Sequence, residues 1–128
     1  MRPFGIFVFS LIMCVLSSCS EPAISEQTMH QVDSLVNIEG RWTPEQVGFA
    51  KDLLIQCYTE ITPRLVDIAD DSKNEKEYLE KSEKIEKELE PVQKLYEKFM
   101  ESSYYQVQYD AVMNAREKML DKVDEALN

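Results

Sequence analysis

Hydrophobic residues recur every three or four positions along most of the chain from residue 42 onward. The first run predicts one buried helix face and consists of Val47, Ala50, Leu54, Cys57, Ile61, Leu65 and Ile68. Pro63 lies within this run, so the helix is expected to kink there or to restart with Thr62 as its cap. No segment in this part alternates with a period of two, and no β-strand is therefore predicted.

Capping residues mark the start of this first helix. Thr43 suits the N-cap, Pro44 suits the first helical position, and Gln46 completes a capping box. Trp42 before the cap and Val47 after it have the spacing of a hydrophobic staple. Trp42 is therefore assigned to packing in preference to ligand binding.

A second run predicts another helix, and its inner positions are Tyr78, Ser82, Ile85, Leu89, Val92, Tyr96 and Phe99. Ser72 and Glu75 form its expected capping box, and Pro91 is expected to bend or divide it. Acidic residues precede basic ones by four positions, as in Glu77 and Lys81, and each such pair contributes a few tenths of a kcal/mol on an exposed face. This charge run is interpreted as the solvated side of the helix.

A third run predicts the last helix, with inner positions Tyr104, Val107, Ala111, Ala115, Met119, Val123 and Ala126. Ser103 and Gln106 offer a third capping box. Residues 25–37 show a weaker helical pattern, with the alternative that the chain is a disordered tether as far as Arg41. The fold class expected is all-α, a small antiparallel bundle of three main helices with or without a short extra N-terminal helix.

The N-terminus has the pattern of an export signal. A single positive residue, Arg2, precedes a predominantly apolar stretch at residues 4–16. A membrane-spanning helix needs about 20 residues, whereas the core of a signal peptide has about 7 to 15. Residues 4–16 therefore suit a signal peptide.

This stretch ends in Leu16-Ser17-Ser18-Cys19, which resembles the lipobox of bacterial lipoprotein signal peptides. The resemblance implies a diacylglyceryl group on the Cys19 thiol, cleavage between Ser18 and Cys19, and acylation of the new amino end with chains such as palmitate. Serine after the cysteine implies transfer to the outer membrane in a cell with two membranes. Ordinary signal cleavage and an uncut anchor are the alternatives.

These patterns divide the chain into a lipoprotein signal peptide at residues 1–18, a lipidated tether with a weak helix at 19–41, and a helical bundle domain at 42–128. The full chain carries a net charge of −10, and removing Arg2 with the leader makes it −11. Such a surface repels phosphate, which excludes sequence-independent nucleic-acid binding and polybasic attraction to anionic lipid. Membrane contact is therefore expected through the anchor.

Residues suited to catalysis or metal binding are scarce. His30 is the only histidine, and Cys57 is the only cysteine outside residues 1–19. Cys57 lies on an apolar helix face and is interpreted as a small buried hydrophobe. No cofactor or metal site is predicted, because thiolate and imidazole sites need several such ligands. Acidic residues are too abundant for spacing to identify a catalytic pair.

Tyr105 and Tyr109 are one helical turn apart and lie off the face that begins at Tyr104. Exposed tyrosines are favoured in protein interfaces, so the pair is a candidate binding site for a protein or glycan, with ordinary packing as the alternative. The expected function is a non-enzymatic binding or scaffold module in the cell envelope. The alternatives are an acidic inhibitor or immunity-type protein that neutralises a basic enzyme or toxin, and an enzyme that uses scattered carboxylates.

Overall fold

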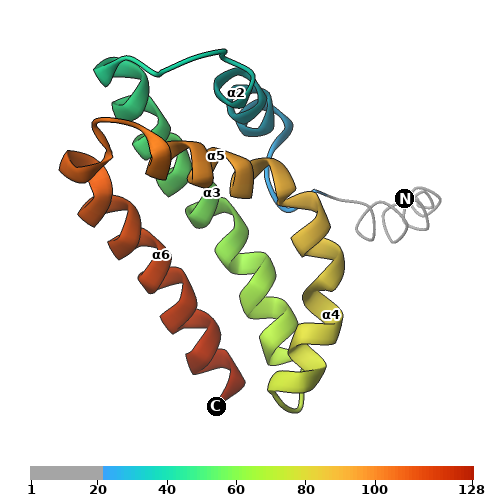
Figure 1. Cartoon of the computed structure of the whole chain (residues 1–128). Coiled ribbons are helices and arrows are strands. Elements are labelled where there is room, and N and C mark those ends of the chain that lie inside the picture. The colour runs from blue at the N-terminus through green and yellow to red at the C-terminus, as the bar shows by residue number, and fades with distance from the viewer. Residues whose placement is uncertain (1–21) are drawn as a thin grey trace, which may run out of the picture.

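The computed structural model describes residues 22–128, and this range is all-helical, with no strand. Its five helices are α2 (Glu26–Val36), α3 (Pro44–Asp70), α4 (Glu75–Glu88), α5 (Glu90–Glu101) and α6 (Tyr105–Leu127). α3 and α6 lie side by side and run in the same direction, while α4 runs back along α3 (Figure 1). The predicted leader and the lipidation site at Ser18 and Cys19 lie outside the described residues.

The start of α3 has the predicted capping box. The Gln46 backbone N–H donates to Thr43 Oγ1 at 3.2 Å, and the Thr43 N–H donates to Gln46 Oε1 at 2.8 Å. Trp42 and Val47, the expected staple pair, are both buried in the hydrophobic core. The predicted inner face is also confirmed for Val47, Ala50, Leu54, Cys57 and Ile61, which are all buried.

Pro63 lies inside α3, which continues to Asp70 without the expected restart. Proline has no N–H, so the helix loses one backbone hydrogen bond at this point. The hydroxyls of Thr59 and Thr62 donate to the carbonyls of Ile55 and Tyr58 at 2.8 and 2.6 Å. Thr62 is therefore an interior helical residue that bonds back to the preceding turn, and the alternative in which it caps a restarted helix is wrong.

The second predicted helix is divided into α4 and α5, so the expected count of three main helices is not matched. Leu89 is both the C-cap of α4 and the N-cap of α5, and Pro91 is in the first turn of α5. A proline here cannot donate to the carbonyl of Lys87, and its ring would clash with that carbonyl in a continuous helix. As a result α5 crosses α3 instead of extending the line of α4 (Figure 1).

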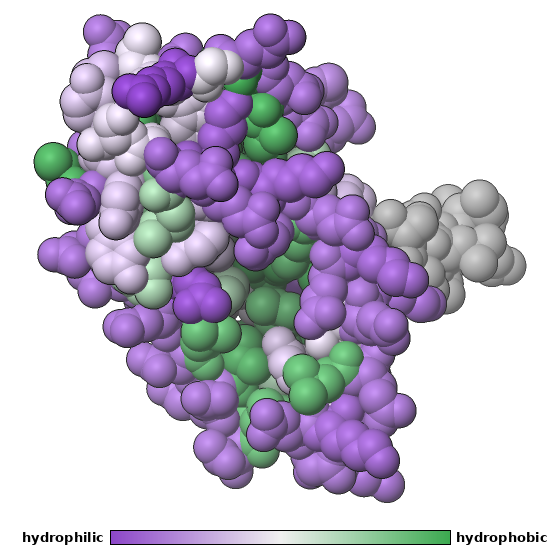
Figure 2. Space-filling model, in the orientation of Figure 1, coloured by the Kyte–Doolittle hydropathy of each residue, from purple (hydrophilic) through white to green (hydrophobic). Residues whose placement is uncertain are grey.

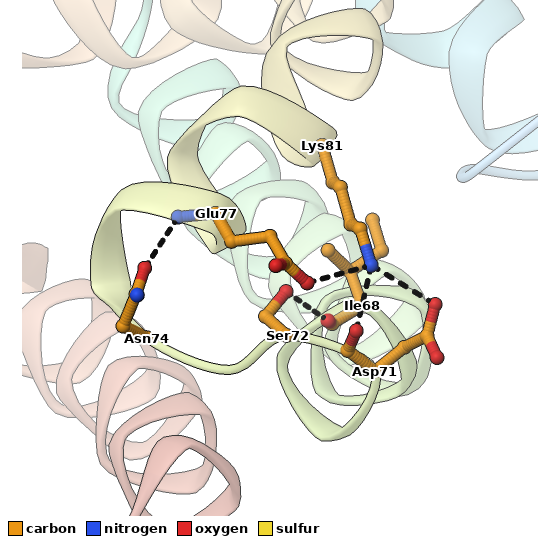
Figure 3. Close-up of polar contacts among 6 residues, drawn as sticks. All are labelled: Ile68, Asp71, Ser72, Asn74, Glu77 and Lys81. Atoms are coloured by element: carbon orange, nitrogen blue, oxygen red, sulfur yellow. Dashed lines mark hydrogen bonds and ion pairs between the residues drawn. The ribbon is translucent and has the colours of Figure 1, made fainter.

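Two predicted caps are wrong. Asn74, not Ser72, caps α4 by accepting a hydrogen bond from the Glu77 N–H at 2.9 Å. The Ser72 hydroxyl instead donates to the Ile68 carbonyl at 2.7 Å and is occupied at the end of α3 (Figure 3). α6 begins at Tyr105 with no side-chain cap, so the predicted box at Ser103 is not formed.

Lys81 fixes the turn between α3 and α4. Its ammonium group donates to the Asp71 carbonyl at 2.6 Å and pairs with the Asp71 carboxylate at 3.1 Å (Figure 3). It also pairs with Glu77 at 3.0 Å, which confirms that predicted i to i+4 contact. This exposed group holds the start of α4 against the end of α3.

Residues 26–36 form α2, which confirms the helical alternative for this segment. Ser25 is its N-cap, and Val32 and Leu35 are buried in the main core. Ile24, just before the helix, is buried in the same core. Most of the range predicted as tether is therefore packed, which leaves residues 19–23 between the predicted lipid site and the folded part.

The first half of α6 is rotated relative to the prediction. Tyr104 is 47% exposed and Val107 is 83% exposed, although both were expected to face inward. Val112 is fully buried in their place, and Tyr105 packs against the core. The prediction holds again near the C-terminus, where Val123 is buried.

The main core lies where α2, α3, α5 and the start of α6 meet. Its largest fully buried side chains are Val32, Val47, Leu54, Cys57, Leu95, Phe99 and Val112. Further buried residues in the second half of α3, in α4 and near the end of α6 lie outside this cluster. The molecule is therefore packed most completely at the end that holds the α5–α6 turn.

Candidate functional site

The structure brings the two predicted tyrosines together beside the α5–α6 turn. The Tyr105 and Tyr109 rings meet edge to face, with centroids 6.0 Å apart and planes at 78°. Tyr105 also meets the buried Phe99 ring, with centroids 6.3 Å apart and planes at 74°. Both tyrosines are half-buried: Phe99 orients Tyr105, Tyr105 in turn orients Tyr109, and part of each ring remains accessible.

The same turn exposes two apolar side chains that the sequence analysis had assigned to the core, Tyr104 and Val107. Tyr104 directly precedes α6, and Val107 lies on the side of α6 opposite Tyr105 and Tyr109, two positions from each of them. Both faces have helical spacing, and the spacing contains no signal that decides which one is buried. The exposed Val107 therefore does not extend the surface of the tyrosine pair.

A cavity of about 210 Å³ lies between the α2–α3 loop and the end of α5. It is lined mainly by Arg41, Trp42, Lys98, Glu101, Ser102 and Ser103. The loop bends at Gly40, whose φ of +81° is strained for residues with a side chain. This loop brings Trp42 to α5.

Lys98 holds the loop in place, a role that the sequence analysis missed. Its ammonium group donates to the carbonyls of Val36 and Ile38 and lies 5.5 Å from the centre of the Trp42 ring. A lysine at the C-terminal end of a helix satisfies its last carbonyls and interacts favourably with its dipole. The Trp42 indole N–H donates to the Leu35 carbonyl at 3.3 Å, also at the end of α2.

These contacts limit what the cavity can bind. The Trp42 side chain is only 4% exposed, and the Lys98 ammonium is occupied by backbone carbonyls. The exposed Arg41 and Glu101 remain as polar groups at the cavity. The geometry therefore confirms the packing role predicted for Trp42.

The carboxylate of Glu60 fixes the other end of α2, next to the predicted tether. It accepts hydrogen bonds from the Ser25 N–H at 2.7 Å, the Thr28 hydroxyl at 2.6 Å and the Gln56 amide at 2.7 Å. Burial alone would raise the pKa of Glu60, but these hydrogen bonds outweigh it and lower the pKa to about 2. The charged form of Glu60 therefore ties the start of α2 to α3.

Replacing Glu60 with glutamine should destabilise the fold by about 1 to 3 kcal/mol at pH 7, because charge-assisted hydrogen bonds are lost. The pKa of the folded form lies below the ordinary 4.5, so Glu60 stabilises the fold above that pH. This stabilisation is lost as the pH falls from 4.5 toward 2. Urea unfolding at pH 7 and at pH 3 measures both effects, and the difference between the two proteins should shrink at pH 3. An equal difference at both pH values would contradict this role.

The described residues offer little for nucleophilic or metal chemistry. Cys57 is buried as predicted, and burial, with a smaller contribution from Glu60, raises the pKa of its thiol to about 12. A thiol with that pKa is not a nucleophile at neutral pH. His30 lies exposed on α2, and between residues 22 and 128 no group of three or more potential metal ligands comes together.

Comparison with protein-family models, curated proteins and solved structures gives no match. Over the part of the chain that the structure describes, no helix is both long enough and apolar enough to cross a membrane.

Proposed function

We propose that this chain is a lipid-anchored protein of the bacterial cell envelope, cleaved after Ser18 and lipidated on Cys19. The lipobox-like residues Leu16 to Cys19 and the apolar stretch before them support the proposal. In a cell with two membranes, Ser20 favours the outer one. Two or more acyl chains anchor a protein stably, whereas one chain binds only marginally.

The packed N-terminal helix makes the proposed tether short. Ile24 is buried in the core, so only residues 19–23 separate the lipid from the folded domain. Five stretched residues span about 17 Å, against about 75 Å if the tether extended to Arg41. The domain is thus held beside the bilayer, while the net charge of −11 that remains after Arg2 leaves with the leader gives it no attraction to anionic lipid.

The domain itself is proposed to be a non-enzymatic binding or scaffold module. The single observation that carries this proposal is the partly exposed pair Tyr105 and Tyr109, in which Phe99 meets Tyr105 edge to face and Tyr105 meets Tyr109 in the same way. Aromatic side chains fixed in this way lose little conformational entropy when they bind. The partner is a protein or a glycan of the envelope.

Replacing Tyr105 and Tyr109 with alanine should lower crosslinking to this partner in the native envelope by about tenfold or more, as expected for interface aromatics. Because Tyr105 packs on the core, the helical CD and the unfolding midpoint are measured alongside. Tyr109→Ala alone is the second variant if the double variant is destabilised. The matched control is the double variant with Tyr105→Phe and Tyr109→Phe, which keeps the packing of both rings. Undiminished capture by a folded alanine variant would remove this face as the binding site.

The second candidate function is an acidic inhibitor or immunity-type protein. Its support is the net charge of −10, which suits a basic enzyme or toxin as partner. Attraction between exposed charges is screened by salt, so capture of such a partner should fall steeply as the salt concentration rises. Capture that resists salt favours the aromatic face instead.

A further inference from the structure

The end of the molecule away from the α5–α6 turn is an open layer of three helices. The second half of α3 lies between α4 and α6, and α5 covers only the first half of α3 (Figure 1). α4 and α6 both pack on α3 but make little contact with each other. Figure 2 shows hydrophobic residues gathered in this hollow, with hydrophilic residues on both sides.

The residues of the three helices explain this apolar surface. On α3, Ile61 is buried, and Leu65 and Ile68 on the same face are only half-buried. On α6, Leu120 is 42% exposed one turn before the buried Val123. On α4, Leu79 is 53% exposed one turn before the buried Ser82. α3 and α6 thus each contribute an apolar face that the fold covers only in part, and α4 adds the exposed Leu79.

The cause of the opening is the break at Pro91. After this residue α5 turns across the first half of α3, where Val92, Leu95 and Phe99 join the main core. No described helix covers the second half in the same way (Figure 1). An apolar helix layer is stable when another element covers it, so a further helix would complete this one.

We propose that the groove formed by Leu65, Ile68, Leu79 and Leu120 binds one amphipathic helix of a basic partner protein. A groove between two helices, with a third as its floor, suits the apolar face of a helix. α4 carries six acidic and four basic residues, and α6 carries five acidic and three basic ones. Each of the two helices that flank the groove therefore has a net charge of −2, which favours a cationic over an anionic helix as the occupant.

Charge also argues against a second copy of the chain in this groove. Each mature copy carries a net charge of −11, and docking would bring two acidic surfaces together. The proposal rests on the binding-module part of the proposed function and names the chemistry of the partner. It does not depend on the lipid anchor.

The test uses the mature chain reconstituted in phosphatidylcholine nanodiscs and a synthetic amphipathic helix of leucine and lysine as the probe. The matched peptide has glutamate in place of lysine, and empty nanodiscs give the background. The lysine peptide should bind and the glutamate peptide should not. Replacing Leu79 and Leu120 with glutamine should weaken binding by about tenfold without changing the net charge. Val107→Gln is the control, because Val107 is 83% exposed near the start of α6 and lies outside the groove.

Three outcomes would overturn the proposal: equal binding of both peptides, equal affinity of the glutamine variant and the unaltered chain, or a dimer that the glutamine variant dissociates. A dimer of this kind would assign the groove to a second copy. A chain that fails to enter the nanodiscs contradicts the anchor alone, and the same titration is then made with the free chain. Failure of the anchor and failure of the groove are thus separate results.

Discussion

A Cys19→Ala chain is expected to incorporate no labelled palmitate in growing cells. The proposed acyl chains need the thiol of Cys19 for the diacylglyceryl group and the amino group exposed by cleavage before it. Each buried methylene contributes about 0.8 kcal/mol to membrane attachment, so loss of all chains removes the anchor. Labelling followed by immunoprecipitation and gel fluorography measures this effect, which should be complete.

Cys57→Ala is the matched control, because Cys57 is buried and its thiol has a pKa of about 12. This variant should carry as much label as the unaltered chain. Label that persists on the Cys19→Ala chain would refute lipidation at residue 19. Loss of label from the Cys57→Ala chain would mean that Cys57 carries an acyl group, which the proposed anchor at Cys19 does not predict.

Phe99→Ala should cost about 3 to 5 kcal/mol of unfolding free energy, the range for deleting a large buried aromatic side chain. Phe99 is fully buried where α2, α3, α5 and α6 meet, and it also supports the Tyr105 ring. The total unfolding free energy of a native protein is about 5 to 15 kcal/mol, so this substitution would remove much of the stability. Urea unfolding followed by the fluorescence of Trp42, the only tryptophan, measures the change.

Val107→Ala provides the comparison for this measurement. Its side chain is 83% exposed, and substitutions at such positions change stability by about 0.5 kcal/mol or less. A Phe99→Ala chain that loses less than about 1 kcal/mol would mean that the core is not centred on this residue. A large loss for Val107→Ala would contradict the observed register of α6.

Local signals predicted α3 well. Its cap at Thr43 and Gln46, the staple of Trp42 with Val47 and its inner face all depend on residues close in sequence. Such short-range rules need no knowledge of the remaining fold. The cap of α4 shows their limit, because Ser72 and Asn74 both suit a helix start and only the turn geometry selects Asn74.

The register of α6 depends on contacts distant in sequence. Tyr104 and Val107, and on the other side of the helix Tyr105 and Tyr109, have equally good helical spacing. The direction that α5 takes after Pro91 places Phe99 against Tyr105, and this contact accompanies the inward rotation of that face. Sequence spacing could identify the tyrosine pair but not its depth of burial.

The polar contacts that position α2 were also beyond prediction from the sequence. Glu60 bonds to Ser25, 35 positions away, and Lys98 bonds to Val36, 62 positions away. No spacing rule links residues so far apart. These two contacts hold both ends of α2, whose Val32 and Leu35 are buried in the main core.

The most direct test of the account is mass spectrometry of the amino-terminal peptide of the native protein. The predicted peptide begins at Cys19 and carries the added mass of a diacylglyceryl group, with or without an acyl chain on its amino group. An unmodified amino terminus, or a protein that still contains residues 1–18, would contradict the proposed anchor.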